Sequence, residues 1–526
     1  MNFEGMEVEM KYDAGAAARV PGLAELPGVA RVASPRVDSL TAVYFDSPGR
    51  ALAGRGITLR RRTGGTDEGW HLKLAPEQPP GNGADAEPGA PEARRRRELH
   101  APLGRADAVP DALLAHLHVH LRGADLAPLV RLETQRTTHA LYGPDGTHLA
   151  DLADDSVTAS LLPAGGGPYQ WREWEFELVH GGPDLLGPAA DLLAAAGATH
   201  TAHGSKLARA LAALAEPLPA DTKRPPGEST PQLAAGKEAP AAAVVGLYFA
   251  THLDKLLGND PGVRLEEPEA VHNMRSAARR LRSALAAYRK LYSKAPVRRL
   301  AEELKWLGGM LGGPRDAEVL RERLDRHAAE LPPGKDSAGA RERLDRHGAE
   351  EFDAGYRRLL LALESGRYFR LLDALEDFRD APPLRLDGAG TKATRRGRKV
   401  SARAVAKAAK RLRRAQDKAS GTAAEGDYEE ALHRVRKDAK RLRHVAESAE
   451  PVRRRARKVA KAAHRQQKVL GDFHDAVIAR DLLARMGSDG PYAVLHAREI
   501  ELMAAAEKKY RKARKKSRRL LHGRIT

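Results

Sequence analysis

The chain has 526 residues, enough for at least two domains. It contains no cysteine, which excludes disulfides, thiolate metal ligands and a cysteine nucleophile. The formal net charge of +19 is distributed unevenly, because residues 1–220 carry 21 Lys and Arg against 28 Asp and Glu, whereas residues 221–526 carry 68 against 42.

This asymmetry indicates that the two halves have different tasks. A basic excess of this size attracts polyanions such as nucleic acid, polyphosphate or an anionic membrane surface. The sequence has no signal-like segment and no apolar run near 18 residues. We therefore expect a soluble, cytoplasmic protein that does not cross a membrane.

The first 215 residues are predicted to form mainly short strands. Segments with alternating apolar and polar residues are separated by clusters of turn residues, which is typical of an antiparallel sheet or barrel. These segments are 5–12, 40–46, 56–62, 69–74, 94–100, 129–142, 147–152 and 170–179. Helical periodicity is confined to 108–121 and 184–215. The Pro-, Gly- and Ala-rich run 76–93 is expected to be a disordered loop between two strands.

The first strand carries charges on one face. Because successive side chains of a strand point to opposite faces, Glu7, Glu9 and Lys11 share a face that Val8 and Met10 do not. Two carboxylates about 7 Å apart on one strand, beside an ammonium group, suit a site that holds a divalent cation together with an anionic ligand. The alternative is an edge strand with a solvated polar face.

Later strands repeat this arrangement with other charges. Arg60 and Arg62 share a face, Lys73 points away from the apolar residues around it, and Glu173 and Glu175 lie opposite an apolar face. If the sheet closes, these charged faces surround a lumen, and a lumen lined by both signs is unfavourable unless a ligand fills it. Mg²⁺ or Mn²⁺ bridging carboxylates to phosphate oxygens, with Arg and Lys neutralising the remaining charge, would satisfy both sets.

Residues 3–215 resemble a CYTH domain of the triphosphate tunnel metalloenzymes. The resemblance rests on a series of short motifs that occur in a fixed order. They are Glu7-x-Glu9-x-Lys11, Tyr44-Phe45-Asp46-Ser47, Leu59-Arg60-x-Arg62, Trp70-x-Leu72-Lys73, Arg96-Arg97-Glu98, Glu173-x-Glu175 and Ser205-Lys206. The resemblance implies an eight-stranded antiparallel tunnel that binds triphosphate with a divalent metal ion.

The resemblance also implies roles for individual residues. The metal ligands would be Glu7, Glu9, Asp154, Glu173 and Glu175. The phosphate-binding residues of the tunnel would be Lys11, Arg60, Arg62, Lys73, Arg97, Arg136 and Lys206. Glu98 would join Glu7, Glu9, Lys11, Glu173 and Glu175 in the catalytic set. Strand alternation lets only one of Arg131 and Arg136, and only one of Asp154 and Asp155, face the lumen; between the arginines, Arg136 is favoured.

The activity implied is metal-assisted hydrolysis of a phosphoanhydride, with inorganic triphosphate as substrate and Mg²⁺ or Mn²⁺ as cofactor. Other activities of the family, thiamine triphosphatase and adenylate cyclase, stay open, although no aromatic cleft for a base is legible in the sequence. A binding protein whose tunnel captures phosphate chains without turnover is the competing class.

A Pro- and Gly-rich segment, 216–239, is predicted to link domain 1–215 to a helical domain, 240–526. The helical part contains an internal repeat. The segment 272–282 returns at 433–443, an offset of 161 residues, and Leu-Gly-x-x-x-Asp-Ala at 311–317 returns at 470–476, an offset of 159. The near-equal offsets indicate a duplicated unit of several helices.

Each copy of the repeat carries a cationic stripe on one helical face. The members of the two stripes are His272, Arg275, Arg279 and Arg282, and His433, Arg436, Lys440 and Arg443. Stacked like charges weaken an isolated helix, so their recurrence indicates a site for a polyanion, with a solvated basic face as the alternative. The histidines are expected to donate hydrogen bonds to phosphate rather than to bind metal. Secondary contacts are expected from Lys305, Arg315, His464 and His474.

Residues 240–526 resemble a CHAD domain, in the doubled His-x-x-Arg-x-x-x-(Arg/Lys)-Arg-Leu-Arg motif and the doubled Leu-Gly-x-x-x-Asp-Ala motif. The resemblance implies two similar helical bundles about a pseudo-two-fold axis, with a basic groove that binds inorganic polyphosphate. It also suggests a location on polyphosphate granules. The basic runs 392–414 and 508–524 would suit nucleic acid as well. No helix-turn-helix, zinc or RNP-like signature accompanies them, which argues against nucleic acid as the partner.

Overall fold

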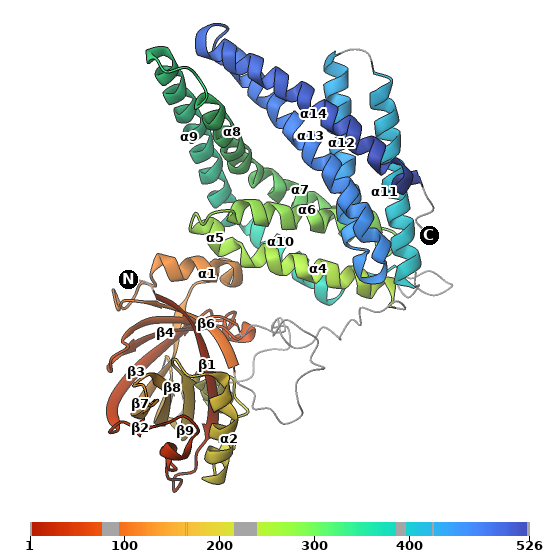
Figure 1. Ribbon diagram of the computed structural model, residues 1–526. Coiled ribbons are helices and arrows are strands. Elements are labelled where there is room, and N and C mark those ends of the chain that lie inside the picture. Colours follow the sequence, from red (N-terminus) through yellow and green to blue (C-terminus); the bar gives the residue numbers. More distant parts are fainter. Residues whose placement is uncertain are drawn as a thin grey trace. The chain divides into compact units, whose positions relative to one another are not determined.

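The computed structural model describes residues 3–75, 94–163, 165, 167–214, 239–385, 396–422 and 425–522. The chain divides into two compact units, Met1–Ser229 and Thr230–Thr526 (Figure 1). Each unit has its own apolar core. The expected loop 76–93 lies outside the described residues, and so does the expected linker apart from Ala239.

The first unit is a closed antiparallel β-barrel (Figure 1). Its strands are β1 (Phe3–Asp13), β2 (Arg31–Val32), β3 (Arg36–Asp46), β4 (Thr58–Thr63), β5 (Gly69–Lys73), β6 (Arg94–Ala101), β7 (Ala127–Tyr142), β8 (His148–Leu161), β9 (Tyr169–Leu178) and β10 (Thr199–His200). The hydrogen-bonded order β1-β6-β5-β4-β3-β7-β8-β9 returns to β1, while the short strands β2 and β10 pair outside this ring. The predicted eight-stranded antiparallel tunnel is confirmed.

Two helices cover the outside of the barrel with apolar side chains. Trp70 of β5 belongs to one buried cluster with Leu117 of α1 (Asp111–Leu121). Trp174 and Phe176 of β9 belong to another with Leu193 of α2 (Leu186–Ala195). Burial of each such side chain contributes about 1.5–3 kcal/mol. Because a shift of one residue would exchange the two faces of a strand, this outer packing turns the alternate, charged positions inward.

Helix α3 (Lys206–Leu214) closes one end of the barrel. There the inward face of the strands is apolar, and Leu132 and Trp171 form a buried cluster with Leu207 and Leu211 of the helix. Lys206 begins the helix and is buried with its side chain in the lumen. These apolar side chains of the helix and strands, here called the apolar plug, fill one end of the barrel. The rest of the lumen is a cavity lined by charged residues.

The second unit is helical. Its helices are α4 (Ala241–Gly258), α5 (Asp260–Arg264), α6 (Ala270–Tyr288), α7 (Lys294–Met310), α8 (Gly312–Ala328), α9 (Lys335–Leu363), α10 (Gly366–Asp380), α11 (Gly397–Ser420), α12 (Glu425–Glu447), α13 (Arg454–Met486) and α14 (Gly490–His522). Short 3₁₀ helices occur at Leu23–Glu25, Ala53–Arg55, Pro183–Leu185 and Glu450–Val452. In the described part of the chain, no helix combines the length and apolar character needed to cross a bilayer.

The predicted duplication is visible in how the helices pack. Helices α4, α6, α7 with α8, and α9 contact one another in the same succession as α11, α12, α13 and α14. Equivalent helices also meet in pairs, α4 with α11, α6 with α12, α8 with α13 and α9 with α14. These pairings agree with the implied pseudo-two-fold arrangement of the two copies. The copies differ at Leu311, where α7 ends and α8 begins, whereas the equivalent Leu470 lies within the unbroken α13 (Figure 1).

Candidate functional site

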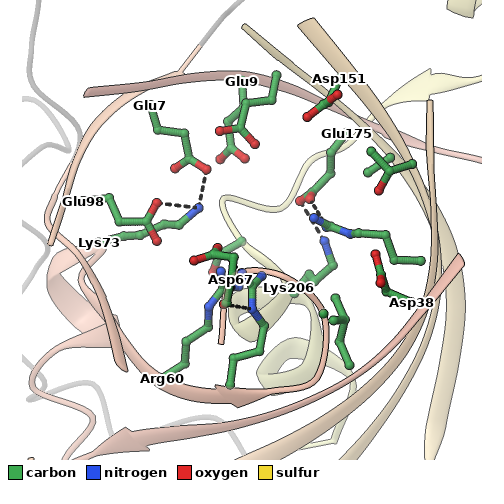
Figure 2. A pocket seen from close by; sticks show the side chains of 18 of the residues that line it. Glu7, Glu9, Asp38, Arg60, Asp67, Lys73, Glu98, Asp151, Glu175 and Lys206 are labelled. Carbon is green, nitrogen blue, oxygen red and sulfur yellow. Dashed lines mark hydrogen bonds and ion pairs between the residues drawn. The ribbon is translucent and has the colours of Figure 1, made fainter. Parts of the chain in front are cut away.

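The barrel encloses a cavity of about 220 Å³ with a mostly polar wall. Side chains from β1, β3 to β9 and α3 point into it (Figure 2). The structure brings together these residues of the predicted tunnel site: Glu7, Glu9, Lys11, Arg60, Arg62, Lys73, Glu98, Arg136, Glu175 and Lys206. Residues 1–220 contain three lysines, Lys11, Lys73 and Lys206, and all three line the cavity.

One side of the cavity is an acidic row. Glu9 of β1 is the cross-strand partner of Glu177 of β9, which is in turn the partner of Asp151 of β8. Figure 2 shows Glu7, Glu9 and Asp151 along this side. Burial together with Glu7 and Glu9 raises the pKa of Glu177 to about 7, and burial also raises the pKa of Glu7. Like charges placed opposite one another are unfavourable, so this row carries negative charge that a cation would neutralise.

A deeper acidic group lies beside the apolar plug. One carboxylate oxygen from each of Asp155, Glu173 and Glu175 lies within 4.8 Å of the others. Lys206 Nζ is 2.9 Å from Asp155 Oδ2 and 2.7 Å from both Glu173 Oε1 and Glu175 Oε1. Arg136 Nη2 is 2.6 Å from Glu175 Oε2. This group therefore already has protein cations as partners.

The donors of the acidic row suit a hard divalent cation. Carboxylate oxygens are the ligands that Mg²⁺ and Mn²⁺ prefer. The Oε2 atom of Glu7 is buried and has no hydrogen-bond partner among the described residues. Lys73 Nζ contacts the other oxygen, Oε1, at 2.5 Å. A bound cation would give the unpartnered Glu7 oxygen a partner, with that oxygen as one of the ligands of the cation.

The opposite side of the cavity is basic. Arg60 donates to the Tyr44 hydroxyl at 3.4 Å, and Arg62 donates to the backbone carbonyl of Asp67 at 2.8 Å. Burial and the neighbouring Arg60 lower the pKa of Arg62 to about 10. Arg96 of β6 lies instead beside the acidic side, because it is the cross-strand partner of Glu7; it is 4% exposed and donates to the Gly204 carbonyl. A cavity with an acidic and a basic side can hold a metal ion and an anion at the same time.

Glu98 and His71 connect the basic side with Lys73. Glu98 Oε1 is 3.0 Å from His71 Nδ1, and Glu98 Oε2 is 3.8 Å from Lys73 Nζ. Burial would raise the pKa of Glu98, but Lys73 and the His71 hydrogen bond outweigh it and lower that pKa. Glu98 is therefore a charged acceptor that orients two neighbours.

Strand alternation decides the choices left open by the sequence. Arg136 donates to Asp155 at 2.7 Å inside the barrel, whereas Arg131 is exposed. Asp154 points to the other face, where Arg172 Nη2 is 2.7 Å from its Oδ2. The expectation that Asp154 faces the tunnel as a metal ligand is therefore wrong in its geometry: Asp155 is the member of this pair inside the barrel, where it is fully buried in the deeper group.

A second correction concerns the run of arginines in β6. Glu98 and Arg96 line the cavity, so the intervening Arg97, an expected phosphate ligand, points away from it. Arg97 is also the cross-strand partner of Met6, whose side chain is 52% exposed. Arg96, not Arg97, is the arginine of these two that lines the cavity.

Several lining residues were missed by the sequence-based prediction. Glu177 could have been included, because it shares a strand face with Glu173 and Glu175. Arg96 likewise alternates with Glu98. Asp151 had no comparable signal, since its place beside Glu177 depends on the register of β8 and β9.

In the helical unit, the two predicted cationic stripes lie close together. Burial, followed by Arg279, Arg436 and Arg275, lowers the pKa of Lys440 to about 7. Burial and Arg275 lower the pKa of Arg279 to about 10. Asp316 is an acidic partner, with Oδ1 2.7 Å from Arg275 Nη1. Cations from α6 and α12 are thus held together against their mutual repulsion.

The stripe histidines occupy matched surroundings in the two copies. The ring of His433 lies 4.3 Å from that of His474, and burial with His474 lowers the pKa of His433 to about 4. Burial and Arg315 lower the pKa of His272. Both imidazoles are therefore neutral near pH 7 and can each donate one hydrogen bond to an anion.

The remaining predicted residues of the helical site include Arg443, Arg282 and Lys305, and each has a different environment. Arg443 Nη1 is 2.9 Å from His464 Nδ1, and its Nε is 2.7 Å from Glu447. Burial lowers the pKa of Arg282. Lys305 is exposed on α7, and its inclusion in the site stays a prediction.

A groove of about 790 Å³ also lies between α6, α11 and α12. Its basic lining comes partly from the predicted basic run 392–414 and partly from arginines outside that run. The basic side chains of the lining include Arg289, Lys407, Lys410, Arg411, Arg414, Arg434 and Arg441.

Comparisons with known proteins agree with the division of the chain into a barrel unit and a helical unit. Residues 5–211 match the CYTH domain and residues 247–484 match the CHAD domain. Two uncharacterized proteins of Mycobacterium tuberculosis, from strains CDC 1551 / Oshkosh and H37Rv, are each 36% identical over 554 residues, covering 98% of this chain and 98% of their own. The chain therefore belongs to the family of proteins that join a CYTH domain to a CHAD domain.

Solved structures similar to part of this chain include PptA from Streptomyces chartreusis. It is 22% identical, with a TM-score of 0.43, and the match covers 53% of this chain and 100% of that one. The CHAD domain from the plant Ricinus communis is also 22% identical, with a TM-score of 0.42, over 55% of this chain and 93% of that one.

Proposed function

We propose that the tunnel hydrolyses inorganic triphosphate with Mg²⁺ or Mn²⁺ and that the helical unit binds inorganic polyphosphate. The observation that carries the first part is the pairing of an acidic and a basic side within one small cavity. A metal ion held at Glu7, Glu9 and Glu177 would neutralise phosphate charge and polarise the phosphoanhydride. Glu175 and Glu173 complete the carboxylate set on the same strand.

The chain's own residues supply orientation and charge. Arg60, Arg62, Arg96 and Arg136 approach the cavity from three strands and hold phosphate oxygens. Such positioning, together with charge stabilisation, provides most of the catalysis in phosphoryl transfer. A carboxylate of the acidic row accepts the proton of the attacking water.

The cavity favours a small anion over a nucleotide. Its volume of about 220 Å³ is below the roughly 300–1,000 Å³ of pockets for drug-sized ligands. Its described lining contains one aromatic side chain, Tyr44, whose hydroxyl faces Arg60. Thiamine triphosphate and ATP are therefore expected to be poorer substrates than inorganic triphosphate.

The test is phosphate release by the full chain from inorganic triphosphate, thiamine triphosphate and ATP, with Mg²⁺, with Mn²⁺ and with a chelator. We expect metal-dependent release that is fastest with inorganic triphosphate. A folded protein that binds triphosphate without metal-dependent release would support the non-catalytic alternative. A preference for either organic substrate would reassign the activity within the family.

For the helical unit, we expect the full chain to bind long-chain polyphosphate more tightly than duplex DNA at the same ionic strength. The double variant Arg279→Gln/Arg436→Gln removes two cations from the paired stripes, so polyphosphate affinity should fall at least tenfold and its salt dependence should become shallower. Binding isotherms at several salt concentrations measure both effects.

The exposed Arg326→Gln change on α8 is a suitable control. Tighter binding of DNA than of polyphosphate, or unchanged affinity in the double variant, would contradict this part of the proposal. If both parts hold, tethering through one chain raises the local concentration of the polyanion near the tunnel.

A further inference from the structure

Two imidazoles and a carboxylate meet beside the tunnel. His71 of β5 and His100 of β6 are direct cross-strand partners, with ring centroids 4.7 Å apart. Asp67, in the turn between β4 and β5, places Oδ1 3.8 Å from His71 Nε2 and 3.7 Å from His100 Nε2. The three ligand atoms lie within 4.8 Å of one another. They are distinct from the carboxylates of the acidic row.

The hydrogen bonding of His71 favours a metal-binding tautomer. Its Nδ1 lies 3.0 Å from Glu98 Oε1, and a carboxylate there must accept a proton from the ring. Its Nε2 lies 3.1 Å from the Asp67 carbonyl oxygen, so a metal ion at Nε2 would replace a hydrogen bond between these two atoms.

The carboxylate beside His71 Nδ1 matches an arrangement found in many metal sites. Metal-binding histidines commonly donate the second ring N–H to a carboxylate, which fixes the tautomer and raises the basicity of the ligand nitrogen. Glu98 occupies that position for His71. Glu98 would thus act as a positioning residue for this ring.

The backbone around His100 is shaped for its position. Gly69 has a φ of +152°, and a Cβ there would lie 2.4 Å from His100 Nε2 and 2.5 Å from the Ala101 carbonyl oxygen. A side chain at position 69 would therefore collide with the His100 ring. His100 Nε2 also faces the Glu68 carbonyl oxygen at 3.3 Å.

We propose that His71 Nε2, His100 Nε2 and the Asp67 carboxylate form a site for a first-row transition metal ion of the Zn²⁺ class. Two imidazoles with one carboxylate and an open position are a common Zn²⁺ ligand set, and imidazole selects such ions over Mg²⁺. The ion would hold the turn between β4 and β5 against β5 and β6. Because Arg62 also contacts Asp67, the site adjoins a phosphate-binding arginine of the tunnel.

The test is calorimetric titration of the full chain with Zn²⁺ in excess Mg²⁺, which occupies the carboxylate sites. We expect wild type to bind Zn²⁺, and His100→Gln and Asp67→Asn each to weaken one binding event at least tenfold. Asp67 has a 60% exposed side chain, so its variant is not expected to disturb the fold. In the wild type, Co²⁺ in place of Zn²⁺ should give visible absorption bands that both variants lose.

The exposed His180→Gln change in the same unit is the matched control and should bind Zn²⁺ as wild type does. Glu9→Gln should keep the event, because Glu9 belongs to the acidic row. Zn²⁺ bound elsewhere, for example between His433 and His474, would be insensitive to the Asp67 and His100 changes. Equal Zn²⁺ binding by wild type, His100→Gln and Asp67→Asn would overturn the proposal, whatever the tunnel hydrolyses.

Discussion

Replacing Glu9 with glutamine is expected to reduce metal-dependent phosphate release from inorganic triphosphate by about 10²–10³-fold. Glu9 is 3% exposed, faces Glu177 across the strands and lies 2.7 Å from Lys11 Nζ. The amide keeps the size of the side chain but removes one negative charge from the acidic row. The rate at saturating metal should fall, and the metal concentration that gives half-maximal rate should rise. Both follow from titrating the release assay with Mn²⁺.

Glu133→Gln provides the control for Glu9→Gln. Glu133 lies on β7 with its side chain exposed, so it shares the chemistry of Glu9 but not its place in the cavity. Its variant should release phosphate at the wild-type rate. If Glu9→Gln folds normally and keeps the wild-type rate, the acidic row does not hold the catalytic metal.

Replacing Lys206 with methionine is expected to destabilise the barrel by about 3–5 kcal/mol, because removal of one partner leaves buried charges uncompensated. Lys206 Nζ contacts Asp155, Glu173 and Glu175 within 2.9 Å, and Asp155 is fully buried. Urea unfolding followed by tryptophan fluorescence measures the effect. Of the four tryptophans, Trp70, Trp171 and Trp174 lie in the barrel, so the signal reports mainly on this unit.

The same variant should respond more strongly to divalent cations. With Lys206 gone, the three deep carboxylates form a site that binds a cation only in the folded state, so Mn²⁺ should raise the stability of the variant more than that of wild type. Arg105→Met, which removes a solvent-exposed pair with Asp107, should change neither quantity noticeably. Wild-type stability of Lys206→Met would show that the deep group does not depend on this lysine.

The strands and the inward face of β1 were predictable because alternation is a local property of an extended backbone. Each predicted segment overlaps a strand of the ring, although β3 begins at Arg36 rather than 40 and β8 continues to Leu161 rather than ending at 152. Glu7, Glu9 and Lys11 share the cavity face. The duplication was predictable for a similar reason, since equivalent helices carry the same spacing of charged and apolar residues. Leu281 and Leu442 are both fully buried, as their positions off the cationic stripes require.

The sequence did not predict which residue faces the lumen where two adjacent strand residues have the same chemistry. Asp154 and Asp155 are both acidic, and β6 begins with a run of four arginines that includes Arg96 and Arg97. A step of one residue reverses the face of a side chain, so composition could not choose between them. The pairing of Arg136 with Asp155 and of Glu98 with Lys73 across strands made the choice.

The sequence by itself determined the two kinds of fold, the charges available to each and the faces of most strands, because these depend on residues a few positions apart. Only the tertiary structure decided which distant side chains meet. The row of Glu9, Glu177 and Asp151 and the pair of His71 and His100 follow from strand register. The closeness of Arg279 and Lys440 follows from helix packing. Register and packing are set by the whole apolar core, so no short segment of sequence contains them.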